Sequence, residues 1–195
     1  MLSALPVVVA LATSAATPSP RPSSTAAARV TSQANPDAAA QADFQARLQQ
    51  YVKLRQEVSS RLKPLAKTAN AAELAARQES LAAAIRDVRR NAKRGDLIPA
   101  AVAAQIARTV QEDFRRRQAS ATRAVLDEVP DHVVPVVNKT LPDSAALATV
   151  PPLLLNNLPR LPDNIQYRFL GRNVILLDGD TRLIMDYVPD VLPPH

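Results

Sequence analysis

The chain of 195 residues contains no cysteine, so disulfide bonds, thiol catalysis, thiolate metal sites and a cysteine-linked lipid anchor are excluded. Glycine is almost as scarce. The three glycines are far apart, which excludes the glycine-rich loops that cradle phosphate groups. Because only 3% of the residues are aromatic, the core must consist mainly of leucine, valine, isoleucine and alanine.

Side chains typical of catalysis are also few. The only histidines are His132 and His195, and there is no Gly-x-Ser-x-Gly motif. Without a His-x-x-x-His pair, a two-histidine metal site would need the C-terminus to fold back. We therefore predict that the protein is not an enzyme and has no catalytic residue, no cofactor and no resident metal.

The apolar run at residues 2–11 is too short to cross a bilayer, which takes roughly 20 apolar residues. Small residues follow it, so residues 1–16 are predicted to be a secretory signal peptide, although no Lys or Arg precedes the run. Residues 17–36 are rich in Pro, Ala, Ser and Thr and are predicted to be a disordered tether. The prediction is export to the periplasm or the medium, with no membrane span after signal cleavage.

Residues 37–129 are predicted to form a helical hairpin or bundle. Asn35-Pro36-Asp37 is typical of a helix start, with a capping side chain, a proline at the first position and an acid near the positive end of the dipole. Pro64 should end or kink this helix. Its apolar stripe consists of Phe44, Leu48, Tyr51, Val58, Leu62 and Leu65.

Two further helices are expected in this region. The segment from Asn70 to Glu73 resembles a capping box, and Arg94-Gly95 should end the helix that it starts. A third helix is expected from about residue 99 to 114, or on to 126. Such stripes also fit a coiled coil between chains, so a homo-oligomer is an alternative. The stripes are Leu74, Leu81, Ile85 and Val88 in the second helix and Val102, Ile106, Val110 and Phe114 in the third.

The formal charge of +6 is concentrated in residues 86–123, where ten basic residues exceed four acidic ones by six. This segment predicts a helix face that binds an anionic partner; a solvated face with local ion pairs is the alternative. Nucleic acid is not expected, because Phe114 is the only aromatic residue here and single-strand binders interleave aromatic with basic residues. The candidate anion- or partner-binding residues are Arg86, Arg89, Arg90, Lys93, Arg94, Arg115, Arg116 and Arg117.

Seven prolines make residues 130–164 a link, in which short helices are expected near 142–150 and 152–157. Residues 132–137 fit an extended edge segment, where proline is tolerated. Four leucines of the link are too apolar to stay in solvent, so they should cover the meander or the end of the bundle. These leucines are Leu153, Leu154, Leu155 and Leu158.

Residues 165–189 are rich in strand-forming residues and are followed by a tail, residues 190–195. The predicted fold is α+β and mainly α, with two or three antiparallel amphipathic helices and a small C-terminal antiparallel β-meander. Apolar residues on both faces of the meander require cover on both, by helices, the leucine-rich link or a second copy. The predicted strands are 167–170, 173–177 and 182–188, joined by turns at Gly171-Arg172 and Asp178-Gly179-Asp180.

Four segments are similar to known sequences, namely residues 91–96 (NAKRGD), 161–162 (LP), 167–172 (YRFLGR) and 183–187 (LIMDY). Together they resemble a family of uncharacterised exported bacterial proteins with an Arg-rich helical region and a C-terminal YRF-x-GR β-meander. The resemblance covers roughly residues 74–189 and implies export and this layout, with no activity attached. At Ile98-Pro99 the chain departs from the aromatic residue that the family tends to have. The meander alone also resembles the C-terminal hairpin of periplasmic proteins linked to nickel and cobalt homeostasis.

Three functional hypotheses follow. The first is an exported, non-enzymatic binding or adaptor protein that holds an envelope protein with its basic helix face and meander. The second is a periplasmic metal-response or metal-binding protein that uses Asp178, Asp180, Asp186 and His132. The third is a binder of the anionic envelope surface, which salt would weaken. We interpret Asp178-Gly179-Asp180 as a plain turn whose acids accept hydrogen bonds from turn N–H groups, because the next residues lack the ligands of a calcium loop.

Overall fold

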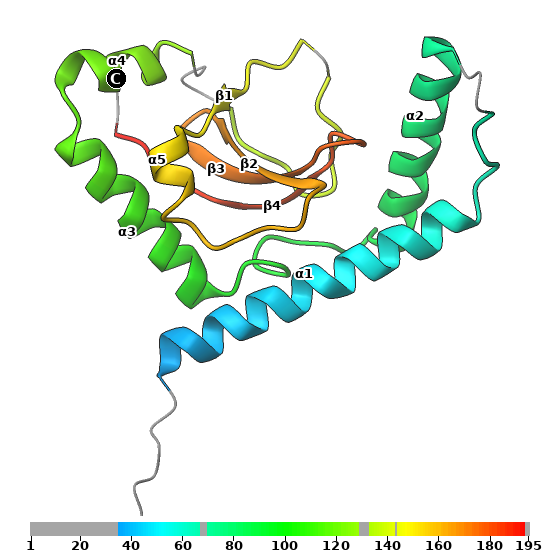
Figure 1. Ribbon diagram of the computed structural model, residues 1–195, viewed down its shortest axis with the longest axis horizontal. Coiled ribbons are helices and arrows are strands. Elements are labelled where there is room, and N and C mark those ends of the chain that lie inside the picture. Colours follow the sequence, from blue (N-terminus) through cyan, green and yellow to red (C-terminus); the bar gives the residue numbers. More distant parts are fainter. Residues whose placement is uncertain (1–34, 67–69, 129–132, 143, 194–195) are drawn as a thin grey trace, which may run out of the picture. The chain divides into compact units, whose positions relative to one another are not determined.

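A small antiparallel sheet near the C-terminus, with helices packed on one face, dominates the computed structural model (Figure 1). This mainly helical α+β arrangement confirms the predicted fold class. The predicted signal peptide, His132 and His195 lie outside the described residues, as does nearly all of the predicted tether. No helix in the described part is long and apolar enough to cross a membrane. The described residues are 35–66, 70–128, 133–142 and 144–193, all within one compact unit.

Helix α1 spans Pro36–Ser60 and begins as the sequence predicts. The Asn35 side chain accepts a hydrogen bond from the Asp37 N–H at 3.1 Å, which satisfies one of the free donors of the first turn. The helix ends before Pro64, and Leu65 is exposed beyond that end. The buried stripe residues of α1 are Phe44, Leu48, Tyr51 and Val58.

Helix α2 spans Ala71–Val88 and starts with the predicted capping box. The Asn70 side chain accepts from the Glu73 N–H at 2.9 Å, and the Glu73 carboxylate accepts from the Asn70 N–H at 3.3 Å. The predicted end at Arg94-Gly95 is wrong, because the helix stops at Val88. The stripe is also wrong at Leu74 and Val88, which are 46% and 53% exposed, since α2 buries only a short face around Leu81, Ala82 and Ile85.

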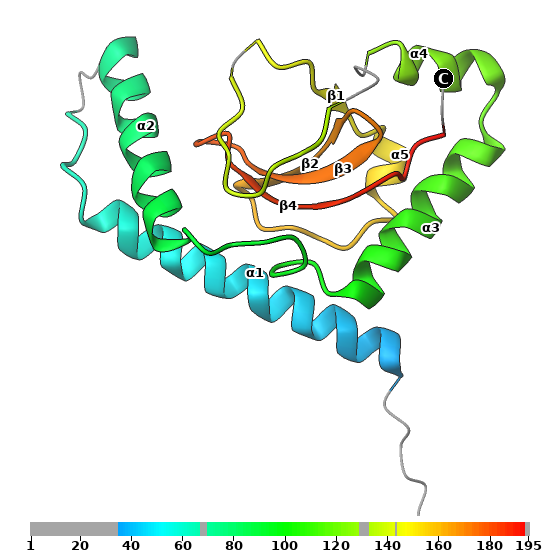
Figure 2. The same cartoon turned by 180° about the vertical axis from the view of Figure 1, so that it is seen from behind.

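Helix α3 spans Ala100–Arg116 and buries the whole predicted stripe, Val102, Ile106, Val110 and Phe114. It does not continue, because the backbone is extended at Arg117 and Gln118 before α4 begins at Ala119–Leu126. Helices α2 and α3 lie against opposite ends of α1 (Figures 1 and 2). Arg77 of α2 donates to the Ser59 carbonyl at 3.1 Å and to the Ser59 hydroxyl at 3.3 Å, and Gln41 of α1 donates to Gln105 of α3 at 3.1 Å.

The sheet has the strand order β1-β2-β3-β4, and every pairing is antiparallel. The predicted three-strand meander is present, and Gly171, with φ +55°, makes the tight turn between β2 and β3. Strand β1 was not predicted. A helix was expected there, but Ala148 pairs with Phe169, so pairing with β2 overrides the local preference. The strands are β1 Ala148–Thr149, β2 Ile165–Leu170, β3 Asn173–Asp178 and β4 Ile184–Val188.

The proline-rich link contributes pieces to both faces of the sheet. The short helix α5, Pro152–Leu155, confirms one predicted helix, and Leu154 and Leu158 are buried in the main core. The described part of the predicted edge segment, residues 133–137, is not a strand. The link instead joins the edge of β4 further along, through an isolated bridge between Thr140 and Leu183.

The two faces of the sheet are covered differently. One face packs its large side chains, such as Phe169 and Leu176, into the main core with α1, α2 and α3, and we call it the helix-covered face. The other face is covered by residues 133–147 of the link, and we call it the link-covered face. Its buried residues are Leu141, Leu170, Ile175, Leu177 and Ile184.

Candidate functional site

Asp186 is fully buried on β4 and fixes the turn between α2 and α3. It lies opposite Leu176 in the sheet and so belongs to the helix-covered face. Its carboxylate accepts from the N–H groups of Gly95 at 3.0 Å, Leu97 at 2.9 Å and Ile98 at 2.8 Å. Gly95 has φ +90°, a conformation that side chains other than glycine rarely adopt. Asp186 is therefore a structural anchor.

Asp178, at the end of β3, anchors α1 in the same way. It is fully buried, and its Oδ2 accepts from the Tyr51 hydroxyl at 2.7 Å and from Arg55 Nε at 2.9 Å. Its Oδ1 accepts from the N–H groups of Asp180 and Thr181 at 3.1 Å, which confirms the interpretation of this segment as a turn. Burial, and then the charge of Asp178, raises the pKa of Tyr51 above its ordinary value, so the phenol remains a donor.

These contacts bear on the metal-binding hypothesis. All four carboxylate oxygens of Asp178 and Asp186 already accept hydrogen bonds from protein donors, and Arg55 also pairs with Asp180. Within the described residues no three histidine or acidic side chains are placed to hold a metal ion. The geometry of this region favours structural roles for the three aspartates.

The first five candidate basic residues lie around the end of α2 and the turn after it. Arg89 is half-buried over the Tyr51 ring at 5.3 Å and donates to the Met185 carbonyl at 3.1 Å, and burial lowers its pKa. Arg86 donates to the Thr140 hydroxyl at 2.9 Å, and Arg94 lies over the Tyr187 ring at 5.6 Å. Only Arg90 and Lys93 of this group are exposed without a side-chain contact in the described part of the chain.

The other three candidates, Arg115, Arg116 and Arg117, lie at the C-terminal end of α3. Arg117 pairs with Asp113 and lies over the Phe114 ring at 5.5 Å. Figures 1 and 2 show that this end of α3 is remote from the end of α2. The eight candidates therefore fall into two separate groups, and six of them make side-chain contacts within the chain, all except Arg90 and Lys93.

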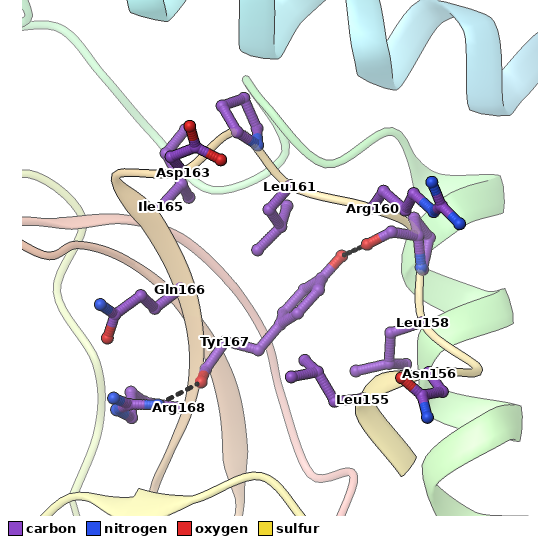
Figure 3. A pocket seen from close by; sticks show the side chains of 12 residues that line it. Leu155, Asn156, Leu158, Arg160, Leu161, Asp163, Ile165, Gln166, Tyr167 and Arg168 are labelled. Carbon is purple, nitrogen blue, oxygen red and sulfur yellow. Dashed lines mark hydrogen bonds between the residues drawn. The ribbon is translucent and has the colours of Figure 1, made fainter. Parts of the chain in front are cut away.

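A pocket of about 570 Å³ opens between α5 and β2, at the opposite end of the sheet from α2 (Figures 1 and 3). The segment after α5 forms its wall and is held in three places. Tyr167 donates to the Pro159 carbonyl at 3.0 Å, Gln45 donates to the Arg160 carbonyl at 2.8 Å, and the Ile165 N–H donates to the Pro162 carbonyl at 2.9 Å. The pocket is therefore built into the fold, and we call it the α5–β2 pocket.

The lining of this pocket combines apolar surface with unused polar groups. Figure 3 shows the Tyr167 ring between Leu155, Leu158 and Leu161, with the side chains of Gln166 and Arg168 on the opposite side of β2. The side chains of Asn156, Arg160 and Gln166 make no hydrogen bond or ion pair with any described residue. Next to the pocket, Leu153 is 76% exposed. The site offers an apolar surface around Tyr167, and the exposed side chains of Asn156 and Arg160 add hydrogen-bond donors and one positive charge.

The lining offers little for catalysis. Asp163 is its only carboxylate, and it contains no serine, threonine, histidine or cysteine. Burial raises the pKa of Tyr167, whose hydroxyl is already bonded to Pro159. A nucleophile with an adjacent base, the usual requirement of covalent catalysis, is not found among these residues.

The sequence analysis did not identify this site, because Arg160 and Arg168 lie outside the charge-rich segment. The available signal was the leucine run 153–155 between prolines, which was expected to be covered but is partly exposed. Comparisons of the chain with protein families, with curated proteins and with solved structures found no match. The resemblance to exported bacterial proteins stays a prediction.

Proposed function

We propose that the protein is an exported, non-enzymatic binding protein, an adaptor that holds a segment of an envelope protein in the α5–β2 pocket. The observation that carries this proposal is a preformed pocket with an apolar surface beside the exposed side chains of Asn156 and Arg160, which have no partner among the described residues. Ligand pockets commonly combine an apolar lining with a few polar groups that orient the ligand.

The lining indicates the chemistry of that segment. The guanidinium group of Arg160 and the carboxylate of Asp163 belong to the lining, while Arg168 extends from the other face of β2 and donates to the Tyr167 carbonyl at 3.3 Å. Leu155, Leu158 and the exposed Leu153 provide the apolar surface. The complementary partner is an extended segment that has one or two large apolar side chains and an acidic residue, because arginine binds carboxylates with two parallel hydrogen bonds.

Peptides selected from a random library against the full chain test this proposal. Leu155→Asp and Arg160→Glu should each reduce peptide binding about tenfold or more, since each removes a central contact. Arg90→Glu is the matched control, because Arg90 is equally exposed and belongs to the basic group at the end of α2. Far-UV circular dichroism checks that every variant is folded.

The outcomes separate the three hypotheses. Loss of binding in Arg160→Glu but not in Arg90→Glu supports the pocket, and apolar contacts should keep most of the affinity at high salt. Loss of binding in Arg90→Glu but not in Arg160→Glu, together with loss at high salt, would instead support binding of an anionic surface by the basic helix residues. Calcium or nickel binding that Asp178→Asn abolishes, with no peptide selected, would favour the metal-binding hypothesis.

A further inference from the structure

A second, smaller hollow lies on the link-covered face of the sheet. Its volume is about 230 Å³, and it lies between residues 133–142 and 145–146 of the link and the side chains of Leu170 and Ile184. With the exception of Lys139, every described residue that lines it is apolar. The lining residues are Val133, Val134, Val136, Lys139, Leu141, Pro142, Ala145, Ala146, Leu170 and Ile184.

The walls of this hollow are fixed to the sheet at both ends. The Asn138 N–H donates to the Ile184 carbonyl at 2.7 Å, and the Ile184 N–H donates to the Lys139 carbonyl at 3.0 Å. At the other end, the Asn173 side chain donates to the Val133 carbonyl at 3.1 Å. The link is therefore held in place above a hollow that opens to solvent beside Val134 and Val136, so a ligand that fills it would bury apolar surface.

The mouth of the hollow is apolar with one positive charge. Val134 and Val136 are 78% and 53% exposed, which is unusual for two valines on one short segment. Lys139 is exposed, and its ammonium group makes no ion pair with any described residue. Among the described residues that line the site Lys139 carries the only charge, which favours a negative group at the mouth.

We infer that this hollow, the link pocket, binds an aliphatic carboxylate, with the hydrocarbon chain inside and the carboxylate at Lys139. At roughly 30 Å³ per group, the volume that one water occupies in the liquid, 230 Å³ corresponds to a chain of about eight carbons. Burial of the chain supplies most of the affinity, and the ammonium group of Lys139 sets the polarity of the head group. This site is independent of the α5–β2 pocket.

Sodium octanoate and octan-1-ol, titrated into the full chain by calorimetry, test the inference. Both should bind with saturation at a single site. Lys139→Met should weaken octanoate about fivefold, as expected for an exposed ion pair, and leave octanol unchanged. Lys53→Met, which removes an exposed lysine from α1, is the matched control and should change neither affinity.

A space-filling substitution and methyl NMR locate the site. Ala146→Trp should abolish binding of both ligands, and octanoate should shift the methyl signals of Val133, Leu141, Leu170 and Ile184. Arg160→Glu should have no effect, which separates this site from the α5–β2 pocket. The inference is overturned if octanoate does not saturate, if Lys139→Met binds it as the original chain does, or if the shifts lie elsewhere. If Ala146→Trp does not fold, the comparison of Lys139→Met with Lys53→Met and the methyl NMR shifts still test the inference.

Discussion

The two faces of the sheet are both apolar, but only the helix-covered face has buried charges that fix what covers it. There, Asp178 holds α1 through Tyr51 and Arg55, and Asp186 holds the turn between α2 and α3. On the link-covered face the buried apolar residues are aliphatic, and the link is held by hydrogen bonds at Val133 and at residues 138–142 without a buried charge.

This difference means that the helix-covered face fixes the positions of the elements that cover it, whereas the link-covered face tolerates rearrangement. Apolar contacts are not directional, so a face that relies on them tolerates space and rearrangement. A buried carboxylate must be matched by donors at defined positions, and leaving those donors unmatched is costly. The helix-covered face therefore determines the fold. The link-covered face tolerates the open space of the link pocket.

The largest expected effect compares Leu176 and Ile175, which are adjacent on β3, fully buried and on opposite faces. Leu176→Ala should lower the free energy of unfolding by about 4 kcal/mol, because the helices cannot move into the cavity. Ile175→Ala should cost only about 2 to 3 kcal/mol, since the irregular link can partly collapse. Urea unfolding of both variants measures the difference, and equal costs would contradict the comparison.

The next effect concerns the anchor on the helix-covered face. Asp186→Asn should cost about 3 kcal/mol, because an NH2 group would replace one carboxylate oxygen and face the N–H groups of Gly95 and Tyr187, and hydrogen bonds to a charged group are the stronger ones. Asp87→Asn is the control: Asp87 is exposed on α2, and its loss should cost less than about 0.5 kcal/mol. Similar stabilities for the two variants would show that Asp186 is not an anchor.

Local signals in the sequence were sufficient for most elements. The capping box at Asn70 and the glycine turns of the meander act within a few residues, so they could be read without the fold. The exposure of Leu74, the strand at Ala148 and the partners of Asp186 depend on which distant segments meet, and periodicity does not contain this information. Periodicity likewise does not reveal the α5–β2 pocket, whose lining comes from α5, the segment after it and β2.

The smallest expected effect is on the pH dependence of the free energy of unfolding, and it comes from the buried tyrosines of the helix-covered face. The pKa values of Tyr51 and Tyr167 are both raised above the ordinary value, by burial first and, for Tyr51, by the nearby Asp178. Below pH 10 both phenols are protonated in the folded and unfolded chains, so they leave stability unchanged. Above about pH 10 the unfolded chain loses these protons while the folded chain keeps them, so stability falls by roughly 1.4 kcal/mol per pH unit for each tyrosine.

Tyr167→Phe should therefore reduce the slope of the free energy of unfolding above pH 10 by this amount, measured by urea unfolding between pH 9 and 11. Tyr187→Phe, on the link-covered face, is the matched control, and a slope in Tyr167→Phe equal to that of the original chain would show that the helix-covered face does not bury this phenol.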